Sequence, residues 1–285
     1  MHTSLPIIAV NGVIDAQVSP LDRGFAYGDG VFETCKLHKA KIPLWNLHKD
    51  RLIKSCQQLS IPVELDLLER QLENLVVSLS EKSAQNAVVK ITVTRGEGGR
   101  GYRPPINTKP TIVIGIFPAA NYPEHYFSTG VDVRLCEHRL SRNSNLAGLK
   151  HLNRLEQILA RAEWADDSIA EGLVFDTSGN LIEGVFSNLF LIKDNELYTP
   201  DLSEAGVAGV MRRFIIESAT SQLNLKIKVK HLQRDDLFNS DAVFLCNSLY
   251  GIWPVANILG DAPRSFAMHP FISKLQNLIN EILFN

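Results

Sequence analysis

The first part of the chain alternates apolar and polar positions as strands do, and then changes to the spacing of helices. Two short apolar runs meet at Asn11-Gly12, a pair that is typical of a β-hairpin turn. Strand-like runs follow at residues 30–37 and 42–45, and residues 46–59 form a plausible helix. A second helix is indicated by four leucines on one helical stripe: Leu68, Leu72, Leu75 and Leu79.

The composition becomes β-rich again at residues 87–94 and 111–117. Residues 1–117 are therefore predicted to form a small N-terminal α/β domain. Residues 118–124 begin with PAANYP and combine prolines with small residues. This segment is the best candidate for a linker between two domains.

Beyond the linker, strands and helices alternate to the end of the chain. Residues 131–138 alternate as a strand does, and residues 271–282 have the pattern of an amphipathic closing helix. Residues 151–164 predict another helix, which places Leu152, Leu155, Leu159 and Ala162 on one face. We expect residues 125–285 to form a larger C-terminal α/β domain, and clefts between domains are where small ligands usually bind.

The composition of the 285 residues, 45% hydrophobic and 21% charged, is that of a globular protein. A net charge of −2 without any block of lysine and arginine argues against nucleic acid as a partner. No run approaches the ~20 apolar residues needed to span a bilayer, so we expect no membrane partner and a cytoplasmic location. The four cysteines lie far apart, which predicts reduced thiols and neither a disulfide framework nor a metal site.

A glycine-rich segment, RGEGGRGY at residues 95–102, resembles a dinucleotide-binding turn at first sight. The two prolines that follow, Pro104 and Pro105, forbid the helix whose N-terminus would hold the phosphates. A flexible active-site loop is the better interpretation, in which Arg100 can bind a carboxylate and Tyr102 lies close by. A solvated hairpin is an equally open alternative.

Lys150 follows the small and apolar run Leu146, Ala147, Gly148 and Leu149. An isolated lysine is usually a surface charge. In such surroundings, however, an amine can lose its hydration, which lowers its pKa and makes it nucleophilic toward a carbonyl group. This chemistry indicates a Schiff base, and the obvious carbonyl cofactor is pyridoxal phosphate.

Pyridoxal phosphate would need an acid beside its pyridine nitrogen and a cationic, hydrogen-bonding site for its phosphate. Glu183 follows a predicted turn and is a candidate for the acid. Arg51, the helix entry at Gly209 and the hydroxyl of Ser248 are candidates for the phosphate site. Each also has an ordinary interpretation, as an exposed charge or a helix boundary.

Six segments, in order over nearly the whole chain, carry a resemblance to a known family: FAYGDGVFET, HKDRL, RGEGGRGY, NLAGLKHLNRLEQ, LIEGVFSNLF and GVAGVMR. The set resembles the class IV aminotransferases, the fold type IV pyridoxal-phosphate enzymes. The resemblance implies a two-domain α/β (α+β) fold like that of D-amino-acid aminotransferase, with the active site in the interdomain cleft. It also implies a homodimer with shared active sites.

The resemblance assigns roles around the cofactor. It implies that Lys150 is the catalytic Schiff-base lysine and that Glu183 is the partner of the pyridine nitrogen. Asn153 would lie on the cofactor side of the helix after the lysine. The expected phosphate ligands are Arg51, Ser248 and the backbone N–H groups of Val210 and Met211. The expected substrate-binding residues are Arg100, Tyr102 and Thr34.

Within the family, RGEGGRGY and GLKHLNRLEQ resemble the lyases that convert 4-amino-4-deoxychorismate to 4-aminobenzoate and pyruvate in folate biosynthesis. That activity is therefore expected, with aminodeoxychorismate as the small-molecule partner. A D-amino-acid or branched-chain aminotransferase is the alternative, which Glu33 in GDGVFET favours. Met211, where aminotransferases often have threonine, departs from their pattern. A cofactor-binding protein without turnover is the third possibility.

Overall fold

The computed structural model describes residues 5–284, apart from the side chains of residues 81 and 82. The chain forms two compact units, each made of two segments. The first unit contains Met1–Asn121 and Leu149–Asn153, and the second contains Tyr122–Gly148 and Arg154–Asn285. Lys150 thus belongs to the first unit.

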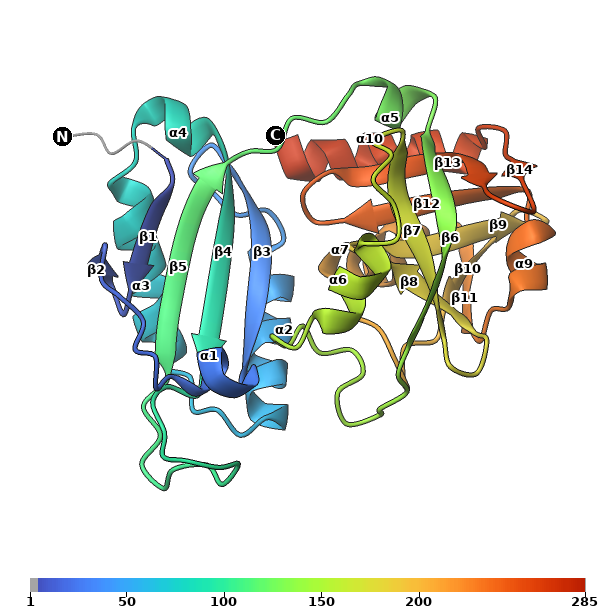
Figure 1. Cartoon of the computed structure of the whole chain (residues 1–285). Helices are drawn as coiled ribbons and strands as arrows, with labels where there is room; N and C mark the ends of the chain where they lie inside the picture. The colour runs from blue at the N-terminus through green and yellow to red at the C-terminus, as the bar shows by residue number, and fades with distance from the viewer. Residues whose placement is uncertain (1–4, 285) are drawn as a thin grey trace. The chain divides into compact units, whose positions relative to one another are not determined.

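The first unit is built on an antiparallel sheet, whose strands within residues 5–284 run in the order β2-β1-β5-β4-β3 (Figure 1). They are β1 (Ile7–Val10), β2 (Val13–Ile14), β3 (Gly30–His38), β4 (Asn86–Thr94) and β5 (Thr111–Pro118). The hairpin predicted at Asn11-Gly12 is confirmed. Both turn residues have positive φ, 51° and 81°, as a tight hairpin turn of this type requires.

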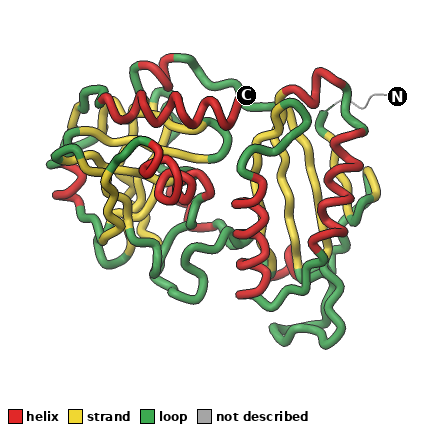
Figure 2. The backbone as a smooth tube through the Cα atoms, turned by 180° about the vertical axis from the view of Figure 1, so that it is seen from behind, coloured by secondary structure: helices red, strands yellow, loops and turns green. Residues whose placement is uncertain are grey.

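Two helices, α2 (Trp45–Gln58) and α3 (Leu65–Val77), pack on one face of this sheet. Figure 2 shows both helices in front of the strands. Leu68, Leu72 and Leu75 of α3 are buried against the apolar side chains of β3, β4 and β5, and Leu79 is buried just beyond the helix. The predicted helix at 46–59 and the leucine stripe are therefore confirmed. Two short helices, α1 (Arg23–Tyr27) and α4 (Glu81–Gln85), complete the unit.

The second unit is built on a mixed sheet, with the strand order β11-β10-β9-β12-β13-β6-β7-β8 and β14 paired to β13 among the described residues. The strands are β6 (Val131–Leu140), β7 (Ile169–Asp176), β8 (Leu181–Gly184), β9 (Asn188–Lys193), β10 (Glu196–Pro200), β11 (Lys226–Lys230), β12 (Ala242–Asn247), β13 (Gly251–Leu259) and β14 (Arg264–Ser265). The predicted strand at 131–138 is confirmed within β6.

Helices cover this sheet. The long helix α10 (Pro270–Phe284) lies along β13 (Figure 1) and buries Ile272, Leu275, Ile279 and Leu283, so the predicted closing helix is confirmed. The others are α5 (His125–Ser128), α6 (Leu155–Arg161), α7 (Val210–Phe214), the π-helix η1 (Ile215–Ala219), α8 (Thr220–Gln222) and α9 (Arg234–Phe238). Because α7, η1 and α8 follow one another without a break, they form one helical run.

The helix predicted at 151–164 differs from the structure in its length. The helix α6 begins only at Leu155, and the side chains of Leu155 and Leu159 are 72% and 55% exposed. The observed helix is thus shorter than the predicted one, and Leu152 lies before it. The residues before the helix are held in extended backbone by hydrogen bonds to β3, and such tertiary pairing overrides helix propensity.

No helix within residues 5–284 combines the length and the apolar character needed to cross a bilayer. Cys35, Cys56, Cys136 and Cys246 are all buried, and each is a free thiol. Burial raises the pKa of the Cys56 and Cys136 thiols to about 12. These cysteines therefore behave as apolar core residues and not as reactive thiolates.

Candidate active site

Lys150 lies in an extended segment that runs beside β3. The backbone N–H of Phe32 donates to the carbonyl of Lys150 at 2.9 Å, and the N–H of Leu152 donates to the carbonyl of Gly30 at 3.0 Å. Since β3 is the last strand of its sheet, its outer backbone groups can accept such pairing. Two hydrogen bonds to a strand thus fix the backbone of Lys150.

The side chain of Lys150 is directed over an aromatic ring. Its Nζ lies 4.4 Å from the centroid of the Phe32 ring, within the range of a cation–π contact. Lys150 as a whole is half-buried. The amine therefore has an apolar neighbour that replaces part of its hydration, while its role in covalent chemistry stays a prediction.

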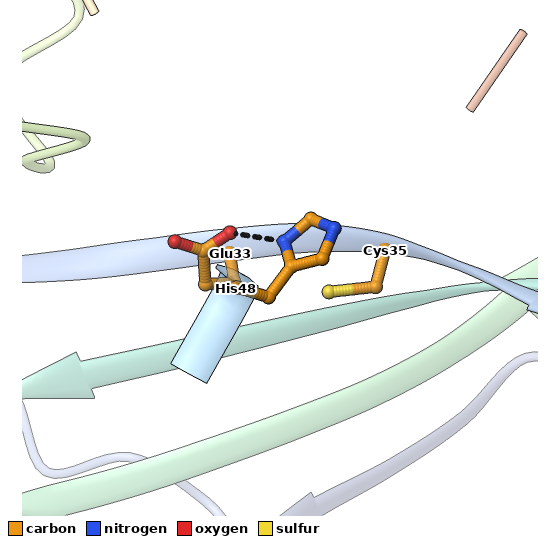
Figure 3. A group of neighbouring side chains, drawn as sticks. All are labelled: Glu33, Cys35 and His48. Carbon is orange, nitrogen blue, oxygen red and sulfur yellow. Dashed lines mark hydrogen bonds and ion pairs between the residues drawn. The ribbon is translucent and has the colours of Figure 1, made fainter. Parts of the chain in front are cut away.

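A buried carboxylate, Glu33, lies on the face of β3 that packs against α2. Figure 3 shows it beside His48 and Cys35. The Nε of Arg51 donates to Oε1 of Glu33 at 2.7 Å, and Nη2 of Arg51 donates to Oε2 at 2.5 Å. The Nδ1 of His48 lies 2.7 Å from the same Oε2. Glu33 therefore binds two side chains of α2 at once.

The charge state of this cluster follows from its partners. Burial opposes ionisation of Glu33, but the Arg51 guanidinium and the His48 hydrogen bond outweigh it and lower the pKa of Glu33 to about 2. Burial lowers the pKa of His48. It outweighs the hydrogen bond and the negative charge of Glu33, which raise this pKa. At neutral pH we therefore assign a carboxylate, a guanidinium and a neutral imidazole that donates from Nδ1.

Glu33, Cys35 and His48 place possible metal-ligand atoms within 4.8 Å of one another. Both carboxylate oxygens of Glu33 are engaged by Arg51, however. A cation would have to displace this guanidinium or lie close to its positive charge. Burial also raises the pKa of the Cys35 thiol well above its ordinary value, so the thiolate that a metal requires is disfavoured. The cluster is an ion-pair site and not a metal site.

Asn153 lies in the first unit, before α6 and not on it. The prediction that it projects from a helix was wrong. Its Nδ2 donates to the carbonyl of Gly28 at 3.1 Å. Gly28 ends α1 with φ of 66°, and a Cβ there would lie 2.5 Å from Oδ1 of Asn153. The residue thus helps to hold the end of α1, and its role toward a cofactor stays a prediction.

Arg100 and Tyr102 lie in the exposed loop between β4 and β5. The chain passes from this loop into β5 and not into a helix, which a dinucleotide-binding turn would need. The tip of the loop is held by Arg23, whose Nη1 and Nη2 donate to the carbonyls of Gly101 and Tyr102, each at 3.0 Å. Thr34 lies half-buried in β3.

Asp29 links the base of this loop to Arg23. Its carboxylate accepts from Nε of Arg23 at 2.8 Å, and from Nε and Nη2 of Arg95 at 2.7 and 3.0 Å. Arg95 also donates to the carbonyls of Leu59 and Ser60. Burial opposes ionisation of Asp29, but the two arginines outweigh it and lower its pKa. The loop therefore starts from a rigid, charged base.

In the second unit, Glu183 is a buried carboxylate on β8, with 4% of its surface exposed. Its Oε2 accepts from the backbone N–H of Val207 at 2.8 Å. Gly206 has φ of 83°, and a Cβ there would lie 3.2 Å from this oxygen and 2.6 Å from the side chain of Ile182. Glycine is therefore required for the segment before α7 to approach the carboxylate.

The start of α7 is equally close-packed. Gly209 precedes the helix, and a Cβ there would lie 1.9 Å from Oδ1 of Asn188. The Nδ2 of Asn188 donates to the carbonyl of Val207 at 2.9 Å. Val210 and Met211, the next two residues, are both buried. Ser248 lies half-buried in the turn between β12 and β13.

Glu171 of β7 is a second buried carboxylate in this unit, and the sequence did not single it out. It accepts from the N–H groups of Gly172, Val185 and Phe186 at 3.0 to 3.3 Å, and from Oγ of Ser187 at 2.8 Å. Burial outweighs these hydrogen bonds and raises the pKa of Glu171 to about 8. The hydrogen bonds of the Glu171 carboxyl group therefore fix the turn that directly follows Glu183.

Three acids with structural roles were thus not assigned from the sequence: Asp29, Glu33 and Glu171. One signal was present for Glu33. Val31, Cys35 and Leu37 share its side of β3 and are buried, so an acid in that alternation must have a partner. His48 and Arg51 are three positions apart, which places them on one face of a helix. Glu171 carries no comparable signal, since its partners are mainly backbone groups.

Comparisons with known proteins place this geometry in context. A sequence model described as class IV amino-transferase matches residues 30–258. Aminodeoxychorismate lyase of Vibrio harveyi is 36% identical to the chain, over 95% of the chain and 98% of the relative.

Solved structures agree with this match. The crystal structure of 4-amino-4-deoxychorismate lyase from Pseudomonas aeruginosa is 40% identical, has a TM-score of 0.91, and is covered over 97% of this chain and 99% of that one. The branched-chain amino acid aminotransferase of T.th. with pyridoxamine 5'-phosphate is 21% identical, with a TM-score of 0.82 over 99% and 95% of the two chains. The predicted fold type is confirmed by these neighbours.

Proposed function

We propose that this chain, which belongs to the class IV aminotransferase family, is a pyridoxal-phosphate-dependent lyase that converts 4-amino-4-deoxychorismate to 4-aminobenzoate and pyruvate. The observation that carries this proposal is the similarity to aminodeoxychorismate lyases over nearly the full length of both chains. The segments RGEGGRGY and GLKHLNRLEQ, which resemble the lyase branch, support it.

The residues of the chain suit pyridoxal phosphate, which supplies a protonated ring that accepts electrons when it is bound. Glu183 is a buried carboxylate, held in place by the backbone N–H of Val207. We assign it to the ring nitrogen, because a buried acid stabilises a nearby positive charge. In the first unit, Lys150 provides the amine for covalent attachment, beside the ring of Phe32.

We assign the phosphate to a guanidinium, to backbone N–H groups and to a hydroxyl of the chain. Arg51 provides a guanidinium whose plane is set by Glu33. The N–H groups of Val210 and Met211 begin a helical run, where anions bind favourably. We assign the hydroxyl of Ser248 and the amide of Asn153 to the same cofactor.

Lys150 is also assigned the proton transfers of the reaction. Its Nζ takes the proton from the substrate ring carbon that bears the amino group, and later donates a proton to the departing enolpyruvate. Acid–base catalysis of this kind typically contributes about 100-fold to 10,000-fold to the rate. Arg100, Tyr102 and Thr34 are assigned to the substrate, where the guanidinium of Arg100 suits a carboxylate.

We further propose that the protein acts in the cytoplasm, in folate biosynthesis, as a homodimer of subunits that each contain two domains. Two observations support these finer statements. The four cysteines are buried free thiols, as is common in reducing compartments. Leu155, Ile158 and Leu159 on α6 are each more than half exposed, and an apolar helix face of this kind favours a partner surface.

An aminotransferase that acts on branched-chain or D-amino acids is the second candidate. The similarity in fold to a branched-chain aminotransferase and the presence of Glu33 in GDGVFET favour it. The two activities differ in what they consume. A lyase releases pyruvate from a single substrate, whereas an aminotransferase needs an amino donor and a keto acid.

The test is to incubate the purified protein, loaded with pyridoxal phosphate, with 4-amino-4-deoxychorismate and no added keto acid. Pyruvate and 4-aminobenzoate should form in equal amounts. Turnover that appears only with an amino donor and a keto acceptor would replace the proposal by the second candidate. A preparation that does not take up the cofactor would contradict both.

A further inference from the structure

Glu33 is an acid in an unexpected place, because it lies close to a site proposed to bind a dianionic phosphate. Only 1% of its surface is exposed. Its neighbours on the same side of β3, Val31, Cys35 and Leu37, are buried and uncharged. Burying an unpaired carboxylate is very unfavourable, so Glu33 needs partners that offset this cost.

The side chain of Glu33 forms hydrogen bonds with two residues of α2. Arg51 forms a bidentate pair with Glu33, in which Nε donates to one carboxylate oxygen and Nη2 donates to the other. Such a bidentate contact sets both the position and the plane of the guanidinium. His48 occupies Oε2 in addition, through Nδ1 at 2.7 Å. The carboxylate is thus itself held from two sides and forms a rigid support.

We infer that Glu33 is a positioning residue of the phosphate site, which fixes the guanidinium of Arg51 in the orientation that receives the cofactor phosphate. The inference rests on the proposed function, since it requires that Arg51 binds that phosphate. The edge of the guanidinium that carries Nε and Nη2 faces Glu33. Glu33 thereby fixes the plane and the rotation of the Arg51 guanidinium.

Charge alone would give the opposite expectation. A carboxylate beside Arg51 offsets the positive charge that attracts a phosphate. His48 does not compensate, because its pKa is lowered by burial and the ring is neutral at pH 7. If only the electric field mattered, removal of the Glu33 charge would strengthen phosphate binding. If orientation matters more, removal weakens it, so the sign of the effect separates the two explanations.

The experiment compares pyridoxal phosphate with pyridoxal, which lacks the phosphate. Both are titrated into cofactor-free Glu33→Gln and wild-type protein, and the dissociation constants are measured by absorbance. We expect Glu33→Gln to weaken the binding of pyridoxal phosphate about 10-fold to 100-fold. This is the range found when supporting residues around a bound group are changed. The affinity for pyridoxal should change less than about twofold.

Two controls isolate the effect. Glu69→Gln removes another acid that holds α2, since Glu69 accepts from Trp45 and Lys49 of that helix and not from Arg51. This variant should bind both ligands like the wild type. Adding Glu33→Gln to an Arg51→Met variant should cause no further loss of pyridoxal phosphate affinity, because Glu33 acts through Arg51.

Equal or tighter binding of pyridoxal phosphate by Glu33→Gln would overturn the inference. So would a parallel loss for both ligands, which would indicate general damage to the fold. If Glu33→Gln does not fold, Glu33→Asp is titrated instead, and its shorter side chain should give the same selective loss. Wild-type protein that binds neither ligand would contradict the proposed function itself, which is a different outcome.

Discussion

Replacing Arg23 by lysine should release the tip of the loop between β4 and β5 without unfolding the protein. The guanidinium of Arg23 reaches three acceptors at once: the carboxylate of Asp29 and the carbonyls of Gly101 and Tyr102. A lysine ammonium is a compact charge that cannot span a fork of this width. We expect the new ammonium group to bind Asp29 alone, so that both hydrogen bonds to the loop are lost.

The size of the effect follows from these two hydrogen bonds. Hydrogen bonds to charged groups contribute about 1.5–3 kcal/mol each, and neutral ones about 1 kcal/mol. Because the loop is exposed to water, we take about 1 kcal/mol for each bond. The loss of about 2 kcal/mol should raise the open fraction of the loop about 30-fold. Asp29 keeps both hydrogen bonds from Arg95, so global stability should fall by less.

Limited proteolysis by trypsin measures the opening. Within the tip, Arg100 precedes Gly101 and can be cleaved, whereas Arg103 precedes Pro104 and resists the enzyme. Cleavage after Arg100 should accelerate about 30-fold if it follows the open population. The KM for substrate should rise more than kcat falls, because Arg100 and Tyr102 are assigned to substrate binding.

Tyr27→Phe is the matched control, since it removes only the hydroxyl that accepts from the N–H of Gly101 at 3.3 Å. We expect a change in cleavage of less than about threefold for this long, exposed hydrogen bond. Unchanged cleavage in Arg23→Lys would refute the reasoning. Faster cleavage that only parallels a loss of urea stability would refute it too, because the loop would then open with the whole protein.

Three further predictions concern other parts of the chain. Lys150→Ala should lose the absorbance of the bound cofactor and nearly all turnover; retained absorbance would remove this amine from the mechanism. The folded-state pKa of Glu171 is raised to about 8 from its ordinary 4.5. Its contribution to stability should therefore be full below pH 4.5 and decline up to about pH 8. Urea unfolding of Glu171→Gln should lack this pH dependence. Gly209→Ala should cost about 1–3 kcal/mol in urea unfolding, because its Cβ would collide with Asn188; an unchanged midpoint would contradict this.

Sequence patterns predicted the first unit well because its elements obey simple periodicity. The hairpin at Asn11-Gly12, the helix α2 and the leucine face of α3 each follow from local spacing and turn chemistry. Their buried faces pack on the sheet of the same unit. Local preference and tertiary packing therefore agree, which is the condition under which sequence reasoning succeeds.

The segment around Lys150 was predicted less well, since its conformation depends on distant residues. The pattern after Lys150 is helical, yet α6 begins only at Leu155, because Lys150 and Leu152 form backbone hydrogen bonds with β3. No local signal reveals that pairing. The sequence placed Leu155 and Leu159 on one face of this helix, but an apolar face does not reveal whether it packs within the subunit or against another protein. The candidate residues were predicted mainly from motifs. A motif identifies a functional side chain but not the residues that hold it in position.

Glu33 and Glu171 show why the supports depend on the three-dimensional surroundings. Both are fully buried glutamates with several hydrogen-bond donors around them, yet the pKa of Glu33 falls to about 2 while that of Glu171 rises to about 8. The difference arises from Arg51: the partners of Glu171 are backbone N–H groups and a hydroxyl, none of which carries a full charge.

This difference suits the two residues to different tasks. Glu33, with a pKa of about 2, is ionised near neutral pH, so it can orient a guanidinium without exchanging protons with the proposed reaction at Lys150. Glu171 changes its protonation near pH 8, so its support of the turn after Glu183 must vary with pH. Cofactor affinity that varies between about pH 6 and about pH 8 should therefore depend on Glu171 and not on Glu33, and the two glutamine variants separate these contributions.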